Sequence, residues 1–178
     1  MSARVPRKPA RAAREAPGRL AAFGGDRVRM VLSSDSSERT AAIGRSMGAL
    51  LPPGAVVSLE GGLGVGKTVL AKGICSGLGV REEVLSPSFI LAEEYHGELP
   101  VFHFDLYRLT KLGEVSEIGL FDAIDGRNVV IIEWGDRLPC GALEVDVEVI
   151  MRIASAEKRE IAVSAQGGFC AALEEALR

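Results

Sequence analysis

The pattern of apolar and polar residues predicts a chain in which buried strands alternate with amphipathic helices. Two apolar runs, 55–59 and 129–134, are short and rich in β-branched residues, as expected of strands buried in a parallel sheet. Residues 69–78 carry apolar side chains at helical spacing, and Gly77 and Gly79 are available to end that helix. This alternation indicates the α/β class.

Other segments have the alternation of antiparallel strands. An edge strand is expected to begin at Arg27, with Val28, Met30 and Leu32 on one face. A hairpin is expected from residues 90–95 and 101–108, with its turn around Gly97. Residues 143–149 and 159–163 are expected to form an antiparallel pair. Together with the buried runs, these strands predict a small α/β sandwich, a three-layer fold with a mixed parallel and antiparallel sheet.

A first helix is expected between the edge strand and the first buried run. Asp35 is the predicted N-cap, with Glu38 three residues later, and the helix runs to about Leu51, where Pro52-Pro53-Gly54 stops it. Further along, residues 111–125 look helical but are interrupted by glycines, and a short helix closes the chain.

The charges divide the 178 residues into two parts. Residues 1–25 hold six basic side chains and one acid, a net charge of +5, so the remainder carries −8 of the total of −3. The first part is rich in Ala, Pro and Arg and is expected to be a disordered basic extension, while residues 26–178 form one folded domain. An acidic body argues against a broad nucleic-acid-binding surface.

Several function classes are disfavoured by composition. No apolar stretch is long enough to cross a bilayer, so no membrane association is expected. The three cysteines form no CxxC pair, which favours a reduced protein in the cytoplasm. The two histidines have no zinc-ligand spacing, and His103, inside an apolar strand, is interpreted as a packed side chain.

Residues 61–68 read Gly-Gly-Leu-Gly-Val-Gly-Lys-Thr, a complete G-x-x-x-x-G-K-[ST] phosphate-binding loop between a predicted strand and a predicted helix. Glycines let backbone N–H groups converge on a polyphosphate, and the helix dipole favours its negative charge. Lys67 would reach the β- and γ-phosphates, and Thr68 would offer its hydroxyl to Mg²⁺. The chain is therefore predicted to bind a nucleoside triphosphate.

Two predicted strands end in an acid, as ATP hydrolysis requires. The run from Val101 to Phe104 closes on Asp105, and the run from Val129 to Ile132 closes on Glu133. At the carboxyl ends of neighbouring strands, Asp105 is the natural Mg²⁺ partner and Glu133 the candidate that polarises the attacking water, although the two roles could be exchanged.

Four segments occur in the order of one family: residues 59–68, 86–89 (Ser-Pro-Ser-Phe), 103–109 (His-Phe-Asp-Leu-Tyr-Arg-Leu) and 132–134 (Ile-Glu-Trp). The chain resembles the TsaE (YjeE) family, the ATPase subunit of the bacterial tRNA threonylcarbamoyladenosine modification system, over roughly Val28 to Val163. The block at 103–109 is far more specific than the phosphate loop.

The resemblance implies an ATPase of the P-loop NTPase-like class that requires Mg²⁺ and acts with a partner complex. The expected partner is a threonylcarbamoyl transferase heterodimer of TsaD- and TsaB-type subunits, which modifies N6 of adenosine 37, so tRNA is contacted only through the complex. Hydrolysis would be slow in the isolated subunit and would reset the complex between cycles.

Carried over to this sequence, the resemblance gives each motif residue a role. The catalytic residues are Lys67, Asp105 and Glu133, and the metal ligands are Thr68, Asp105 and Glu133. The expected nucleotide-binding residues are Gly62, Leu63, Gly64, Val65, Gly66, Lys67, Thr68, Val69, Thr40, Ser88 and Trp134. In this set Thr40 lies near the adenine, Trp134 beside the nucleotide, and Ser88 in a switch-like loop at 86–88 that senses the γ-phosphate.

Three positions depart from the family's usual residues: Gly62 stands for Asp, and Val69 and Ser88 each stand for Thr. Ser88 keeps the hydroxyl, whereas Gly62 and Val69 remove polar groups beside the phosphates, which affects the fine tuning of affinity or rate rather than binding itself.

Three rival functions are disfavoured by the sequence. A small-molecule kinase needs a basic acceptor lid, and the stretch 111–128 is acidic and short of arginines. A GTPase needs an [NT]-K-x-D loop and a D-x-x-G switch, and neither occurs. A non-enzymatic subunit with structural nucleotide is disfavoured by Asp105 and Glu133. The roles of Tyr107 and Arg108, packing or function, stay open.

Overall fold

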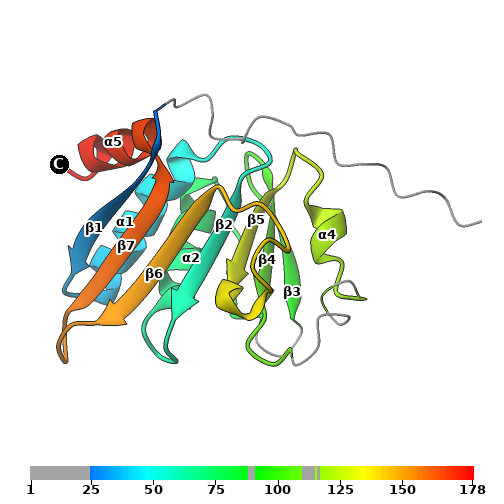
Figure 1. Cartoon of the computed structure of the whole chain (residues 1–178), viewed down its shortest axis with the longest axis horizontal. Coiled ribbons are helices and arrows are strands. Elements are labelled where there is room, and N and C mark those ends of the chain that lie inside the picture. The colour runs from blue at the N-terminus through cyan, green and yellow to red at the C-terminus, as the bar shows by residue number, and fades with distance from the viewer. Residues whose placement is uncertain (1–24, 88–90, 110–114, 116) are drawn as a thin grey trace, which may run out of the picture.

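A seven-stranded sheet with helices on both faces forms the body of the protein, as a computed structural model shows (Figure 1). The structure describes residues 25–87, 91–109, 115 and 117–178. The strands are β1 (Arg27–Ser34), β2 (Val56–Gly61), β3 (Ala92–His96), β4 (Pro100–Asp105), β5 (Val129–Glu133), β6 (Val147–Ile153) and β7 (Arg159–Gln166). The helices are α1 (Ser37–Leu50), α2 (Lys67–Gly77), α4 (Leu120–Ala123) and α5 (Gly167–Ala176), with a 3-10 turn η2 (Gly135–Arg137).

The sheet is mixed, which confirms the predicted fold class. Its order is β1-β7-β6-β2-β5-β4-β3, with β2 parallel to β5 and β6, and β4 parallel to β5. The β1–β7, β6–β7 and β3–β4 pairs are antiparallel, so both expected hairpins and the expected edge strand are present. The parallel centre is the part that brings strand ends of the same polarity to one edge of the sheet.

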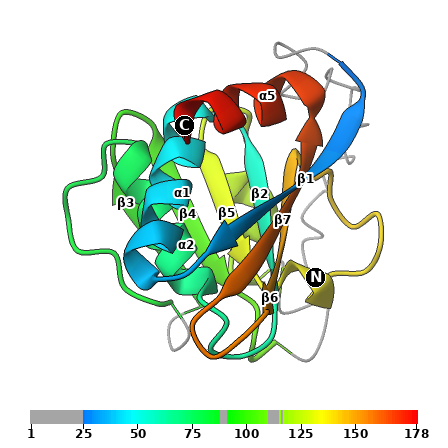
Figure 2. The same cartoon turned by 90° about the vertical axis from the view of Figure 1, so that its left-hand side faces the viewer.

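Two apolar layers hold the helices to the sheet. One face of the central strands packs against α1, α2 and α5 through a cluster that includes Leu59, Ile74, Ile131 and Phe169. The opposite face packs against α4 through a smaller cluster around Phe104. Figure 2 shows α1, α2 and α5 stacked on one side of the sheet. Because strands alternate their side chains, each central strand is apolar toward both layers.

Two strand boundaries differ from the predictions. The expected strand 143–149 begins only at Val147, since the buried Asp146 turns its carboxylate inward to accept the N–H of Val56 at 2.9 Å. The strand predicted to reach residue 108 ends at Asp105, where the chain turns so that the N–H of Leu109 donates to Leu106 O at 3.1 Å.

The predicted N-cap of α1 was wrong by one residue. Ser36, with an extended backbone, accepts the N–H of Arg39 on its hydroxyl at 3.0 Å and is the cap. Asp35 has the same local chemistry, and sequence preference does not separate two adjacent capping residues. Glu38 therefore lies in the first turn, where its charge faces the positive end of the helix dipole, rather than closing a capping box.

Part of the predicted helical stretch 111–125 is outside the described residues, including Gly113. The part that is described contains α4, which begins directly after Gly119, a residue at φ 76°. The basic extension 1–25 also lies outside the described residues, except for residue 25. Among the helices that the structure describes, none is long and apolar enough to cross a membrane.

Helices α1 and α2 approach each other until their backbones touch, and four glycines make this possible. A Cβ added to Gly73 would lie 2.4 Å from Ala41 O, and one added to Gly44 would lie 2.4 Å from Leu70 O. Gly48 and Gly77 make the equivalent approaches further along the same contact. Because α2 starts at the phosphate loop, this contact fixes the position of the loop relative to α1.

We expect Gly73→Ala to lower the melting temperature, although alanine is the better helix former by about 1 kcal/mol. The added methyl meets backbone atoms that cannot rotate away, and overpacking of this kind costs roughly 1–3 kcal/mol. Thermal unfolding followed by circular dichroism measures the effect. An unchanged or raised melting temperature would show that the two helices separate without loss.

The three cysteines are free thiols in the structure. Cys75 and Cys170 are buried and Cys140 is exposed. Burial raises the pKa of the Cys75 thiol to about 12, and burial also raises the pKa of Cys170, so neither forms the reactive thiolate at neutral pH.

We therefore expect a thiol reagent at neutral pH to label one cysteine rapidly in the native protein and all three after unfolding. The rate of labelling, followed by the absorbance of the thiol that the reagent releases, measures this difference. Cys140→Ser is the control, and it should remove the rapid phase. A rapid phase that survives in Cys140→Ser would contradict the burial of the other two thiols.

Candidate nucleotide-binding site

The phosphate loop joins β2 to α2 through glycines whose backbone conformation other residues rarely adopt. Gly61, Gly64 and Gly66 have φ values of 134°, 73° and 112°. Gly66 is the residue before α2, so the loop ends where the helix exposes its unpaired N–H groups. No atom lies within 4 Å of a Cβ placed on Gly64, so the loop is open on that side. These features together form an anion-binding nest.

Lys67 is buried inside this loop. Its Nζ donates to Gly61 O at 2.7 Å and to Gly62 O at 3.0 Å, and it lies 3.5 Å from the centre of the Trp134 ring. Burial lowers the pKa of Lys67, while the negative charges of Glu133, Asp105 and Asp136 oppose that shift. The ammonium is thus held by loop carbonyls and a cation–π contact at the position where phosphate oxygens are expected.

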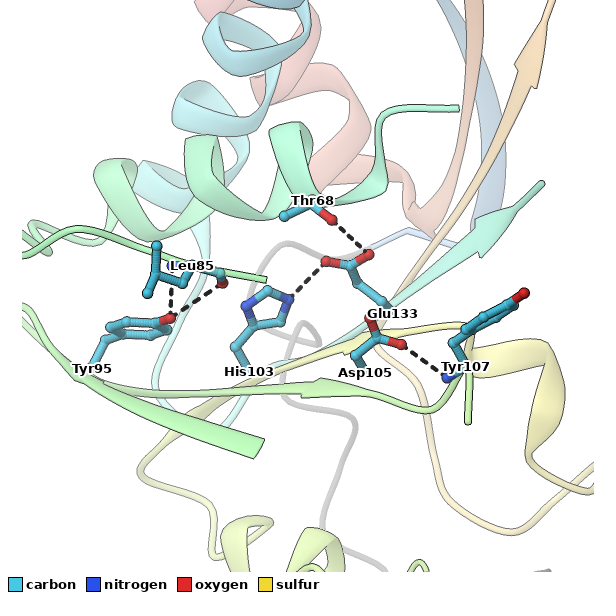
Figure 3. Close-up of polar contacts among 7 residues, drawn as sticks. All are labelled: Thr68, Leu85, Tyr95, His103, Asp105, Tyr107 and Glu133. Atoms are coloured by element: carbon cyan, nitrogen blue, oxygen red, sulfur yellow. Dashed lines mark hydrogen bonds and ion pairs between the residues drawn. The ribbon is translucent and has the colours of Figure 1, made fainter. Parts of the chain in front are cut away.

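The two predicted acids lie side by side, as Figure 3 shows. Asp105 of β4 and Glu133 of β5 are register partners across a parallel pair, and both are 2% exposed. Glu133 Oε2 accepts the Thr68 hydroxyl at 3.1 Å, and Asp105 Oδ1 accepts the N–H of Tyr107 at 2.9 Å. The carboxyl ends of two strands and the start of α2 therefore meet in one place.

Aromatic side chains close one side of the site. Trp134 has a left-handed backbone at φ 60°, and its N–H donates to Leu59 O at 2.8 Å. The Trp134 and Tyr107 rings lie 4.9 Å apart between centroids, and the Arg137 guanidinium lies 5.2 Å from the Tyr107 ring. The left-handed residue turns the chain directly after Glu133, which brings the indole over Lys67.

A pocket of about 360 Å³ unites most of the predicted site residues. Its lining is Leu63, Gly64, Val65, Gly66, Lys67, Thr68, Val69, Ser86, Asp105, Tyr107, Glu133 and Trp134. This volume is in the range of small-molecule sites. Gly62 is not part of this lining, but its carbonyl holds Lys67.

A second pocket, of about 390 Å³, lies on the other side of the phosphate loop and shares Gly64, Val65, Gly66 and Val69 with the first. Thr40 lines this second pocket rather than the first. Its hydroxyl is 3.1 Å from Ser36 O, to which it donates, and 2.8 Å from the Ser34 hydroxyl. Thr40 is only 3% exposed, so it supports the pocket wall more than it presents a free group.

The predicted switch loop is described only in part. Ser86 lines the first pocket, whereas Ser88 lies outside the described residues. The Tyr95 hydroxyl holds the backbone of Leu85, accepting its N–H at 3.1 Å and donating to its carbonyl at 3.3 Å (Figure 3). The start of the loop is therefore tied to β3.

Two residues of the site were not predicted from the sequence as functional. Arg159 lines the second pocket and donates from Nε to Val65 O at 3.2 Å, which ties β7 to the phosphate loop. His103 was interpreted as packed, and it is fully buried, but its Nε2 is 3.0 Å from Glu133 Oε1. The position of His103 two residues before Asp105 puts both on one face of β4, and that spacing was the available signal.

The donor groups fit Mg²⁺ and a nucleotide phosphate. The Thr68 hydroxyl and the carboxylates of Glu133 and Asp105 are oxygen ligands of the kind that Mg²⁺ prefers, and Mg²⁺ normally completes its shell with water and phosphate. Within the described residues no group of three His, Cys, Asp or Glu side chains forms a metal cage. The oxygen ligands are therefore suited to a cation that arrives with a phosphate.

The phosphate loop lies between β2 and α2, at the carboxyl edge of the parallel centre of the sheet, and acids from the neighbouring strands face it. This arrangement defines a nucleotide-binding protein of the P-loop NTPase-like class. The family model described as threonylcarbamoyl adenosine biosynthesis protein TsaE matches residues 34–161. The chain belongs to the TsaE family.

Individual relatives agree with this membership. A tRNA threonylcarbamoyladenosine biosynthesis protein TsaE of Treponema pallidum is 41% identical over 131 residues, which cover 74% of this chain and 97% of the relative. A protein of the same name from Bacillus subtilis is 36% identical, covering 73% of this chain and 82% of the relative. The crystal structure of YdiB from Bacillus subtilis has a TM-score of 0.66 at 31% identity, covering 86% of this chain and 97% of YdiB.

We expect Lys67→Ala to weaken binding of Mg·ATP by tenfold or more, because it removes the one ammonium held within the loop. Charge-assisted hydrogen bonds contribute about 1.5–3 kcal/mol, and about 1.4 kcal/mol corresponds to tenfold in affinity. Isothermal titration calorimetry measures the change. Lys72→Ala, an exposed lysine of the same helix, is the matched control and should bind as the wild type does. Equal affinities for all three proteins would refute the assignment of the site.

Proposed function

We propose that this protein binds ATP with Mg²⁺ and hydrolyses it as the partner-dependent ATPase of tRNA threonylcarbamoyladenosine biosynthesis. The observation that carries the proposal is the contact between Thr68 and Glu133 beside Lys67, at 3.1 Å between Thr68 Oγ1 and Glu133 Oε2. This contact joins the phosphate loop to an acid-ended strand in one pocket. Binding alone requires only the loop, whereas hydrolysis also requires the acids.

The residues divide the work of phosphoryl transfer. Lys67 exchanges its loop carbonyls for β- and γ-phosphate oxygens, and the backbone N–H groups of residues 62–68 hold the same phosphates. Thr68, Asp105 and Glu133 are the residues that would hold Mg²⁺, directly or through water. The metal supplies charge neutralisation of the phosphates. Glu133 orients the attacking water in this proposal, because its carboxylate accepts the Thr68 hydroxyl beside the phosphate loop.

The nucleoside part of ATP occupies the second pocket. The phosphate loop separates this pocket from the first. Thr40 and Val69 lie on the α1 and α2 sides of this pocket, and Arg159 lies on the β7 side. Trp134 lies beside the phosphates, and Ser88 belongs to the switch loop that responds to the γ-phosphate. In this arrangement the loop residues 62–68 bind the phosphates between the two pockets.

The partner is a threonylcarbamoyl transferase heterodimer of TsaD- and TsaB-type subunits. Three large side chains at or next to the first pocket are exposed. Two of them line it, Leu63 at 74% and Tyr107 at 39% exposure, and the third, Leu85 at 56%, precedes the lining residue Ser86. Apolar side chains left exposed beside a functional pocket are typical of a contact with another protein. The acidic body leaves tRNA contact to the complex, and we place the activity in the cytoplasm, with residues 26–178 as the ATPase domain.

We expect Glu133→Gln to retain Mg·ATP binding and to lose at least 90% of partner-stimulated hydrolysis, since a missing catalytic base costs roughly 10²–10⁴-fold. Release of inorganic phosphate and calorimetric binding are the two measurements. The control is Glu94→Gln, a change of the same kind at an exposed position of β3. Undiminished turnover in Glu133→Gln would move the catalytic role to Asp105.

The pathway is tested by reconstitution with the transferase subunits over several turnovers. Wild type and Lys72→Ala should support repeated formation of threonylcarbamoyladenosine at position 37, and Lys67→Ala should not. Equal yields with Lys67→Ala would refute the requirement for ATP bound here. Transfer of labelled phosphate from ATP to a small-molecule acceptor would instead favour a kinase.

A further inference from the structure

His103 is a polar side chain in an otherwise apolar strand. It is 0% exposed, on the face of β4 that packs against α2, together with Val101 and Asp105. Leucine or phenylalanine would fill the same space with no polar atom to satisfy. A buried imidazole therefore needs a reason, because unpaired polar atoms in a core are unfavourable.

The contact of His103 supplies that reason. Its Nε2 lies 3.0 Å from Glu133 Oε1, and the other oxygen of the same carboxylate, Oε2, accepts the Thr68 hydroxyl at 3.1 Å. Figure 3 shows the imidazole and the threonine on opposite sides of the carboxylate. Both oxygens are thus held, and the carboxylate has a single orientation.

The geometry also fixes which nitrogen carries the proton. A carboxylate only accepts hydrogen bonds, so the Nε2–H of His103 is the donor. Its Nδ1 is buried and has no hydrogen-bonding partner among the residues that the structure describes. A lone pair at Nδ1 is less unfavourable there than a buried N–H without an acceptor, so the geometry places the donated proton on Nε2.

We propose that His103 is a positioning residue that holds Glu133 in its working orientation; this inference rests on the proposed ATPase function. Thr68 is also expected to bind Mg²⁺, so its hydroxyl is shared between the metal and Glu133. His103 bonds the oxygen that Thr68 does not touch, and its hold is independent of the nucleotide. A side chain with three rotatable bonds would otherwise leave the reactive orientation.

The kinetic test compares three substitutions of His103 in the full-length chain with its partner subunits. His103→Leu removes the donor, and we expect roughly a tenfold to hundredfold lower kcat with KM for ATP within about twofold. His103→Gln places an amide N–H near the position of Nε2 and should recover most of the rate. His103→Asn places its amide near Nδ1, out of reach of Glu133, and should not.

Several results would overturn the proposal. They are a wild-type kcat in His103→Leu, equal rates for the Gln and Asn variants, or a change confined to KM. Thermal unfolding of every variant identifies simple loss of the fold. If His103→Leu does not fold, the comparison of Gln with Asn decides, because both bury an amide, and thermal unfolding measures what the one methylene between them contributes to stability.

A second readout does not depend on activity. The chain has only two histidines, so nitrogen-15 NMR of labelled histidine resolves each. His103 should show the Nε2–H tautomer, and Glu133→Gln should shift its ring signals. Glu94→Gln is the matched control, because Glu94 lies 3.7 Å from the exposed His96 and should shift that histidine alone.

The two readouts separate the failure of this proposal from that of the ATPase function. His103 signals that do not respond to Glu133→Gln would overturn the proposal even if ATP is hydrolysed. If the wild type hydrolyses no ATP with its partners, the ATPase function fails, and positioning for hydrolysis fails with it, while the NMR shift still establishes the pair.

Discussion

The parallel pairing of β2, β5 and β4 is the constraint on which the site depends. Parallel strands end at the same edge of a sheet, so the last residue of each strand lies beside the last residue of its neighbour. Gly61 ends β2, Glu133 ends β5 and Asp105 ends β4, and the register of the ladders places the two acids opposite each other. A slip of one residue would turn both carboxylates into the layer under α4. The register of the strands must therefore be correct before these side chains can meet in one site.

The other contacts hold this edge in place. The glycine contact between α1 and α2 sets where the first turn of α2 lies, and with it Lys67 and Thr68. On the far side, Arg159 ties β7 to the loop at Val65. The antiparallel strands β1, β7 and β3 extend the sheet so that its parallel centre is covered on both sides.

Most of the fold could be predicted from the sequence because its signals are local. The phosphate loop, the buried strands and the two hairpins each have a pattern of a few adjacent residues, and the acid after each strand marks the edge of the sheet. The cap of α1 could not be predicted, since Asp35 and Ser36 are equally good. The contacts of His103 with Glu133 and of Arg159 with Val65 join segments far apart in sequence. They follow from the register of the whole sheet, which no short segment encodes.

The groups that hold the Lys67 ammonium compete with phosphate for it. The ammonium is already bound by two carbonyl oxygens and an indole ring, so a phosphate must replace ligands that are tethered to the same chain. The apparent affinity for phosphate then equals the intrinsic affinity multiplied by the fraction of molecules in which the lysine is released. The indole belongs to the residue directly after Glu133, at a strained backbone angle. A surface that drew the indole outward would tighten nucleotide binding without touching the nucleotide, and it would also act on the chain at the residue next to Glu133.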